Sequence, residues 1–439
     1  MREIASVAVT VLVLTLSGSA QRQSSPKTEI VATPAAKSAT QARVRGMFPI
    51  GIWMDGRVEG INCPPGCVNV PRDLTQAEAY YGKAFTDIRD HDIEIVVVPN
   101  TPPEYRQLLL DVADRVDVKI VLEIVELSDP QIGGDLSVRS PNMVADDKAL
   151  YDRLKPVIEP LRRHPSLWAY QVADEPPATL APNVIRANRA LRKLDAHRFP
   201  FSCLCNASEL TRTVKMGYPM VVFDWYPLYE SSAPGSYPFT NWLVTCDTIR
   251  SHAEANGLPY WMVIQAFAKP GAWRTPTAGE LRAMTYLSIA RNAKGIFFFL
   301  YNSDSQEEHL EGLVDSELRP TPLLDEAGRI AKDLKRIGPV LAQLDPAPNI
   351  ASTGGPLDVR TFAQRGGARY IFAANTDTVN AVESTGTIGG PAPKKIKRLT
   401  DVSTGENVPL QRDTDSDFPR FTLRLEPGEG RLLRVVTPN

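Results

Sequence analysis

Between residues 47 and 345 the hydrophobic positions follow two alternating patterns. Short, nearly continuous apolar runs, such as residues 93–98 and 119–124, are separated by longer segments, such as 73–91 and 277–292, whose apolar residues recur every three or four positions. The runs are typical of strands covered on both faces, and the longer segments are typical of amphipathic helices. The alternation therefore predicts a parallel sheet wrapped by helices.

Eight such strands are expected before the pattern changes. Because eight units close naturally on themselves and no glycine-rich phosphate turn follows the first run, the sequence favours a (β/α)8 TIM barrel over a doubly wound open sheet. Residues 322–344 should form the last barrel helix. The expected strands span residues 49–54, 93–98, 119–124, 167–172, 200–204, 219–223, 260–264 and 295–300.

After residue 347 the chain changes to short alternating segments set between Gly, Pro, Asn and Asp turns. Residues 359–364, 370–375, 394–399, 421–425 and 431–436 are expected strands, and together they predict a small C-terminal antiparallel β-sandwich. Pro346 and Pro348 mark the end of the preceding helix. We therefore predict a barrel domain over residues 46–346 and a β-sandwich domain over 347–439.

The first 20 residues have the layout of a secretory signal, with Arg2 ahead of an apolar run and small residues up to Ala20. Residues 21–45 are rich in Ser, Thr, Gln and Ala and predict a flexible linker. No later stretch reaches about 20 uninterrupted apolar residues, so no integral membrane segment is expected after cleavage. The sequence thus predicts a secreted or periplasmic protein.

The charge balance argues against a nucleic-acid partner, because 49 basic and 51 acidic side chains give a net charge of -2. Export permits a disulfide, and we predict one between Cys63 and Cys67, which bracket a Pro-Pro-Gly segment. The other cysteines, Cys203, Cys205 and Cys246, are expected to be buried small side chains. The scattered histidines and cysteines show no metal-ligand spacing, so neither a metal nor a cofactor is expected.

The strongest chemical signal lies where the fourth expected strand ends. Its apolar run stops at Asp174 and Glu175, and Pro176 and Pro177 then prevent the ladder from continuing. In a (β/α)8 barrel the carboxyl ends of the strands hold the functional groups. Equivalent positions on the other strands are acidic, amide-rich and aromatic, a mixture that suits a carbohydrate. They are Trp53, Asp55, Asn100, Glu123, Glu126, Asn206, Asp224, Tyr226, Gln265, Tyr301 and Asn302.

The barrel, the sequence Asp174-Glu175-Pro176 and the trailing β-sandwich resemble the clan A glycoside hydrolases over roughly residues 47–439. In that clan the corresponding strand ends Asn-Glu-Pro, and its Glu is the acid/base. The resemblance implies that Glu175 is the general acid, which requires a carboxyl group kept neutral by its surroundings. Asp174 is either a neighbouring charge in the site or a turn residue that accepts backbone hydrogen bonds.

The seventh strand departs from that clan. Where the clan has its nucleophilic Glu, this sequence has Gln265, and an amide cannot act as that nucleophile. We favour Asp224 as the second carboxylate, with Glu123 and then Glu126 as the next candidates. Because Asp224 lies two strands from Glu175, we expect a separation large enough for an intervening water, as in an inverting hydrolase.

The sequence therefore predicts an exported glycoside hydrolase that acts on an oligo- or polysaccharide through Glu175 and Asp224. Trp53, Asn100, Glu123, Asp174, Asn206, Tyr226, Gln265 and Tyr301 are its expected substrate-binding residues. Two alternatives remain open at this point. One is a catalytically silent carbohydrate-binding barrel, which Gln265 favours, and the other is an enzyme of different chemistry on the same fold.

Overall fold

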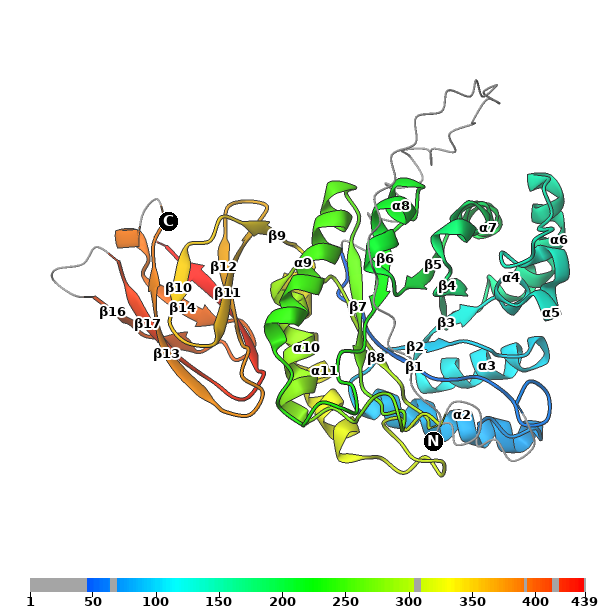
Figure 1. Cartoon of the computed structure of the whole chain (residues 1–439), viewed down its shortest axis with the longest axis horizontal. Helices are drawn as coiled ribbons and strands as arrows, with labels where there is room; N and C mark the ends of the chain where they lie inside the picture. Colours follow the sequence, from blue (N-terminus) through cyan, green and yellow to red (C-terminus); the bar gives the residue numbers. More distant parts are fainter. Residues whose placement is uncertain (1–45, 64–68, 304–308, 391–392, 413–417, 438–439) are drawn as a thin grey trace, which may run out of the picture. The chain divides into compact units, whose positions relative to one another are not determined.

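A closed parallel barrel forms the first part of the protein (Figure 1). The computed structural model describes residues 46–63, 69–303, 309–390, 393–412 and 418–437 of the chain. Each barrel strand pairs in parallel with its neighbours in sequence, and β8 closes the ring on β1. The strands are β1 Ile50–Trp53, β2 Ile95–Val98, β3 Lys119–Glu123, β4 Leu167–Asp174, β5 Phe199–Leu204, β6 Val221–Asp224, β7 Tyr260–Gln265 and β8 Ile296–Phe299.

Helices follow the barrel strands and confirm the predicted (β/α)8 architecture. Apolar side chains on both faces of the sheet explain why the strands read as continuous apolar runs: one cluster fills the space between strands and helices, and a second fills the barrel interior. The helices are α2 Leu74–Asp90, α3 Arg106–Val116, α4 Val125–Ser128, α5 Pro130–Gly133, α6 Asp147–Leu161, α7 Ala181–Leu194, α8 Leu210–Lys215, α9 Phe239–Ala255, α10 Ala278–Ala290 and α11 Pro322–Leu341.

Two antiparallel sheets follow the barrel and confirm the predicted β-sandwich. One has the strand order β10-β13-β17-β16, the other has the order β15-β14-β18-β12-β11-β9, and a separate apolar cluster lies in this region. The strands are β9 Leu344–Ala347, β10 Ala351–Thr353, β11 Leu357–Gln364, β12 Arg369–Asn375, β13 Val382–Ile388, β14 Arg398–Asp401, β15 Asn407–Val408, β16 Leu410–Gln411, β17 Arg420–Leu425 and β18 Gly430–Val436.

The segment expected to punctuate the last helix is itself a strand. In β9, Pro346 lies opposite Phe362 of β11 at the edge of the larger sheet. Proline has no N–H to donate and is tolerated on an edge strand, where one side of the backbone needs no partner. The chain thus passes from α11 to the sandwich within two residues.

Helix α10 contacts both the barrel and the sandwich, which explains why nearly all of its residues are buried. Near its start, Gly279 approaches the sandwich backbone so closely that an added Cβ would lie 2.1 Å from the Thr378 carbonyl oxygen. Tyr286 packs against Phe372 with ring centroids 6.5 Å apart. The sandwich is therefore a packed part of the same unit as the barrel.

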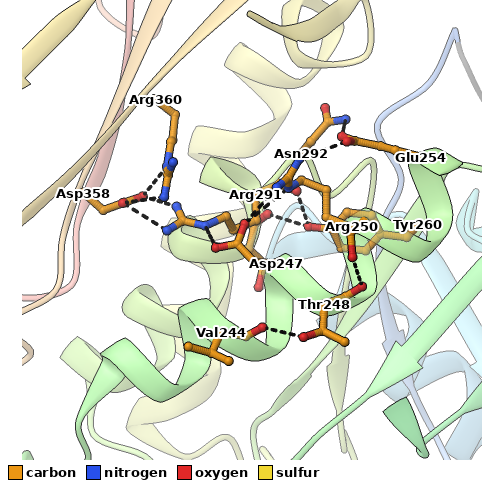
Figure 2. A network of polar contacts seen from close by, with 12 residues as sticks. Val244, Asp247, Thr248, Arg250, Glu254, Tyr260, Arg291, Asn292, Asp358 and Arg360 are labelled. Carbon is orange, nitrogen blue, oxygen red and sulfur yellow. Dashed lines mark hydrogen bonds and ion pairs between the residues drawn. The ribbon is translucent and has the colours of Figure 1, made fainter. Parts of the chain in front are cut away.

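A buried ionic network lies at the end of α10 (Figure 2). The Arg291 guanidinium donates to both carboxylate oxygens of Asp358 on β11, and its Nε donates to Asp247 Oδ2 on α9 over 3.0 Å. Arg291 is only 3% exposed. Its charge is therefore compensated by two acids, one from the barrel and one from the sandwich.

Among the described residues, no helix is long and apolar enough to cross a membrane. The predicted signal at residues 1–20 and the linker at 21–45 lie outside the described residues. Cys63 is disulfide-bonded, but Cys67 also lies outside the described residues, so the pairing of these two cysteines stays a prediction.

Candidate active site

Acidic side chains gather at the carboxyl ends of neighbouring barrel strands. Glu123 ends β3, Asp174 ends β4 with Glu175 directly after it, and Asp224 ends β6. Each strand stops where its apolar run gives way to a carboxylate, so the edge of the sheet places these groups around one opening. The structure thus brings together the four carboxylates that sequence reasoning favoured.

The chain turns sharply at Glu175, the residue that follows Asp174 at the end of β4. Glu175 has a φ of 41°, a left-handed conformation that a non-glycine residue rarely adopts, and its N–H donates to the Cys203 carbonyl on β5 over 3.1 Å. Asp174 Oδ1 accepts from Gln171 Nε2 over 3.0 Å. Such backbone strain costs about 1–3 kcal/mol and persists mainly where function requires the conformation.

Glu175 and Asp224 form a close pair. One carboxylate oxygen of each residue and the Cys205 sulfur lie within 4.8 Å of one another. This separation is shorter than the one expected for an inverting hydrolase, so that expectation was wrong. The reason is local: the turn at Glu175 directs its side chain across β5 toward β6, which strand spacing alone does not reveal.

The environments of the acids differ and shift the pKa values of three of them. Asp224 is 6% exposed, and burial, followed by the charge of Glu175, raises its pKa well above the usual range. Solvent reaches Asp174, yet loss of hydration and the nearby charges of Glu175 and Glu123 raise its pKa to about 7. Burial also raises the pKa of Glu123, although the hydrogen bond from the Asn100 N–H opposes this effect.

Two groups that sequence reasoning missed complete this cluster. Cys205 is exposed rather than buried, because β5 ends at Leu204 and releases it into the opening. Its thiol has a pKa raised to about 12 by loss of hydration and by the charges of Glu175 and Asp224. Arg139 donates to the Asp174 carbonyl, and its positive charge partly opposes the rise in the pKa values of Asp174 and Glu123. The prediction of a buried side chain was correct for Cys203 and Cys246.

An aromatic wall borders Asp224. The Tyr226 hydroxyl donates to the Asp224 carboxylate, and its ring stacks on Phe299 with centroids 5.5 Å apart. Trp273 donates from its indole nitrogen to the Tyr226 carbonyl over 3.0 Å and stacks with Tyr229, which is 51% exposed. The wall therefore continues from the acid pair to an exposed ring, a surface suited to the apolar face of a sugar.

Several residues that were expected in the site instead form hydrogen bonds with one another near the barrel opening. Asn100 donates from its side-chain amide to Asp55 Oδ1 over 3.2 Å, and Asp55 also accepts from Arg57 and Asn69. Asn302 accepts from the Asp55 N–H over 2.9 Å. These contacts fix the segment after β1 and explain why polar residues follow several strands.

Other expected residues lie away from the acid pair. Trp53 is buried in the barrel interior against Phe297, and Tyr301 faces outward, where its hydroxyl donates to Asp87 of α2 over 2.9 Å. Asn206 caps the short 3-10 helix at Ala207–Glu209 by accepting from the Ser208 N–H. Glu126, an alternative second carboxylate, is held by Arg106 in two hydrogen bonds of 3.0 and 2.7 Å.

Gln265 is fully buried and its amide is bonded to the backbone of two loops. Its Oε1 accepts from the Leu228 N–H over 3.0 Å, and its Nε2 donates to the Arg274 carbonyl over 3.0 Å. Position 265 therefore joins the loops that follow β6 and β7 and presents no group to the opening. This placement accounts for an amide where the clan A resemblance implies a carboxylate.

No protein-family model and no curated protein matches this chain. Among solved structures, it is similar to a β-galactosidase from Bacillus circulans sp. alkalophilus (8% identity, TM-score 0.64, 89% of this chain and 99% of that one). It is also similar to a GH27 β-L-arabinopyranosidase from Geobacillus stearothermophilus (12%, TM-score 0.55, 91% and 98%). The chain spans 62% of a β-galactosidase from the psychrophilic Marinomonas ef1 (11%, TM-score 0.49). At these identities the first two likenesses concern the fold, which is shared with glycoside hydrolases.

Proposed function

We propose that this protein hydrolyses glycosidic bonds of an oligo- or polysaccharide with Glu175 and Asp224 as its carboxylate pair. The observation that carries the proposal is the approach of these two groups to within 4.8 Å at the carboxyl ends of β4 and β6. Fold similarity to glycosidases, the exposed turn at Glu175 and the aromatic wall beside Asp224 support it.

The separation favours a retaining mechanism. Retaining glycosidases place their carboxyl groups about 5–5.5 Å apart, whereas inverting enzymes need about 6.5–9.5 Å to admit a water between them. The Glu175 and Asp224 oxygens within 4.8 Å of each other are nearer to the retaining separation than to the inverting one. In the proposed mechanism one carboxylate attacks the anomeric carbon directly and forms a covalent glycosyl intermediate.

Burial supports one order of roles within the pair. Because burial raises its pKa, Asp224 is the carboxyl group better suited to carry the proton and to protonate the leaving oxygen. Glu175 is exposed and attacks the anomeric carbon while the glycosidic C–O bond breaks. Asp224 then removes a proton from the water that displaces Glu175. The opposite order, which the clan A resemblance implies, makes Glu175 the acid.

Trapping with azide distinguishes the two possible assignments of nucleophile and acid/base to Glu175 and Asp224. On an unactivated glycoside, Glu175→Gln and Asp224→Asn should each lower kcat/KM by about 10³-fold or more, because each removes a group used in the transition state. With an aryl glycoside, azide should then trap an inverted glycosyl azide from the nucleophile variant and a retained one from the acid/base variant. If Glu175 is the nucleophile, as we propose, the glycosyl azide formed by Glu175→Gln should have the inverted anomeric configuration.

The control is Glu126→Gln, which removes a carboxylate near the opening that Arg106 already holds. Its folded fraction should keep the activity of the unchanged protein. Hydrolysis that survives both Glu175→Gln and Asp224→Asn undiminished would overturn the proposal. Saccharide binding without turnover across a broad glycan library would favour the silent barrel instead.

We also propose that the protein is exported through residues 1–20, because a polysaccharide is too large to enter the cell. Sequencing the amino terminus of protein recovered from the periplasm or medium should give Gln21. Recovery only from the cytoplasm, with Met1 retained, would contradict export but not hydrolysis.

A further inference from the structure

One oxygen of the acid pair has no hydrogen-bond partner. Asp224 Oδ1 is buried and unpaired among the described residues, on a side chain that is only 6% exposed. An unsatisfied buried carboxylate oxygen is costly, and native proteins rarely keep one without a reason. Asp224 Oδ1 therefore points to a ligand that supplies positive charge or a donor.

A thiol and a second carboxylate lie close to the Asp224 carboxylate. One donor atom each from Glu175, Cys205 and Asp224 lies within 4.8 Å of the other two. A mixed set of two oxygens and one sulfur differs from the all-oxygen sets that suit Mg²⁺ and Ca²⁺, and it matches the borderline-soft preference of Zn²⁺. The three donors also come from three consecutive strand ends, which the closed barrel holds at fixed positions.

We propose that Glu175, Cys205 and Asp224 form a binding site for a thiophilic divalent cation of the Zn²⁺ type. On binding, the proton of the Cys205 thiol and any proton held by Asp224 are released to solvent, and the two positive charges of the cation offset two of the three negative charges on its ligands. The fourth position of a tetrahedral site remains for water.

The geometry requires only small adjustments. Three atoms no more than 4.8 Å apart all lie within about 2.8 Å of a common point, and zinc bonds of roughly 2.0–2.3 Å are reached by side-chain shifts of under about 1 Å. Cys205 and Glu175 are both exposed and can make these shifts, whereas Asp224 is held in place by its surroundings.

The consequence for activity rests on the proposed function. If Glu175 and Asp224 hydrolyse glycosides, a bound cation occupies both and excludes the substrate. The cation then acts as a reversible inhibitor that competes with the saccharide. Cation binding itself requires no glycosidase activity.

The experiment uses the full chain, freed of metal by a chelator and dialysed. Titration with Co²⁺ should give one bound ion per chain and a near-ultraviolet sulfur-to-cobalt charge-transfer band, and Zn²⁺ should displace it in calorimetry. Cys205→Ser should abolish the band and weaken Zn²⁺ binding at least tenfold. Asp224→Asn should weaken it by a similar factor. The matched control is Cys203→Ala, which removes a buried thiol of the barrel interior and should leave both readouts unchanged.

Absence of the band in the unchanged protein, or its survival in Cys205→Ser, would overturn the cation site. Because Cys205 is exposed, its variant should fold, and circular dichroism checks this directly. The proposed hydrolysis and the proposed cation site can be overturned independently. Metal binding without hydrolysis would leave this site standing and remove the proposed function, whereas hydrolysis with no metal binding would do the reverse.

Discussion

Two clusters of ionisable side chains in this protein have opposite arrangements of charge. At the junction of α9, α10 and β11, Arg291 is buried between Asp247 and Asp358, so unlike charges neutralise one another. At the barrel opening, Glu175 and Asp224 lie together with Asp174 nearby, and after burial the charge of Glu175 contributes to the raised pKa values of Asp174 and Asp224. The first arrangement supports the fold, whereas the second is maintained at the expense of stability.

The difference shows where function should be sought. Structural charges can be paired freely, and those at the α10 junction are paired. Acids that remain crowded against one another, with an unpaired buried oxygen on Asp224, need another explanation. Features that lower stability occur mainly at functional sites, and the barrel opening combines crowded acids with an unpaired buried oxygen.

Removing the sandwich tests the junction most severely. A chain that ends at residue 345 loses Asp358, Phe372 and the β-sheet backbone that faces Gly279, so one side of α10 becomes exposed. We expect the largest loss of stability here, measured as a fall in the midpoint of thermal unfolding. An unchanged midpoint would show that the barrel is independent of the sandwich.

A single substitution, Arg291→Met, should have the next largest effect. It leaves Asp358 partly buried without its main cation, and breaking one partner of a buried pair costs about 3–5 kcal/mol. Denaturant unfolding measures the change. The control is Arg360→Met, which removes a 42% exposed side chain from the same carboxylate and should cost less than about 1 kcal/mol. Equal costs for both variants would contradict a special role for Arg291.

The smallest effect is expected from Asp174→Asn, and its sign should be opposite. The pKa of Asp174 is raised to about 7 in the folded state, so the folded protein binds this proton more tightly than the unfolded chain does. Stability from this group is present at acidic pH and is lost as pH rises through about 7. Asparagine avoids that loss, so the variant should gain stability over the wild type between about pH 4 and 7, levelling off above.

Asp135→Asn is the matched control for this pH series. Its carboxylate bonds to Arg153, which lowers the pKa of Asp135. Its stability contribution is therefore present at neutral pH and is lost as pH falls through the lowered pKa. When unfolding is followed from pH 4 to pH 8, Asp174→Asn should gain stability relative to the wild type up to about pH 7, whereas Asp135→Asn should differ from the wild type by a constant amount. An Asp174→Asn curve that runs parallel to the wild type would contradict the assignment for Asp174.

The sequence predicted the barrel well because its signals are local. Each strand is an apolar run long enough to recognise, and strand ends such as Asp174 and Asp224 follow directly from where those runs stop. Short strands such as β15 and β16 went unpredicted because two residues carry no periodicity. Their pairing depends on neighbours far away in the chain.

The directions of the side chains at the strand ends could not be predicted from the sequence. Trp53 turns into the barrel and Tyr301 turns out toward α2, although both follow similar apolar runs. Cys205 reaches the opening only because β5 stops one residue earlier. Arg139 gave no local signal, since it lies 35 residues before the Asp174 carbonyl that it contacts.

Gln265 has an evolutionary consequence. Its Nε2 lies 3.0 Å from the Arg274 carbonyl and 3.3 Å from the Leu228 carbonyl. A glutamate there would set a carboxylate oxygen against these carbonyl oxygens in a dry site, so Gln265→Glu would separate the two loops instead of creating a nucleophile. In evolutionary terms, a seventh-strand nucleophile would require changes in both loops as well as at position 265.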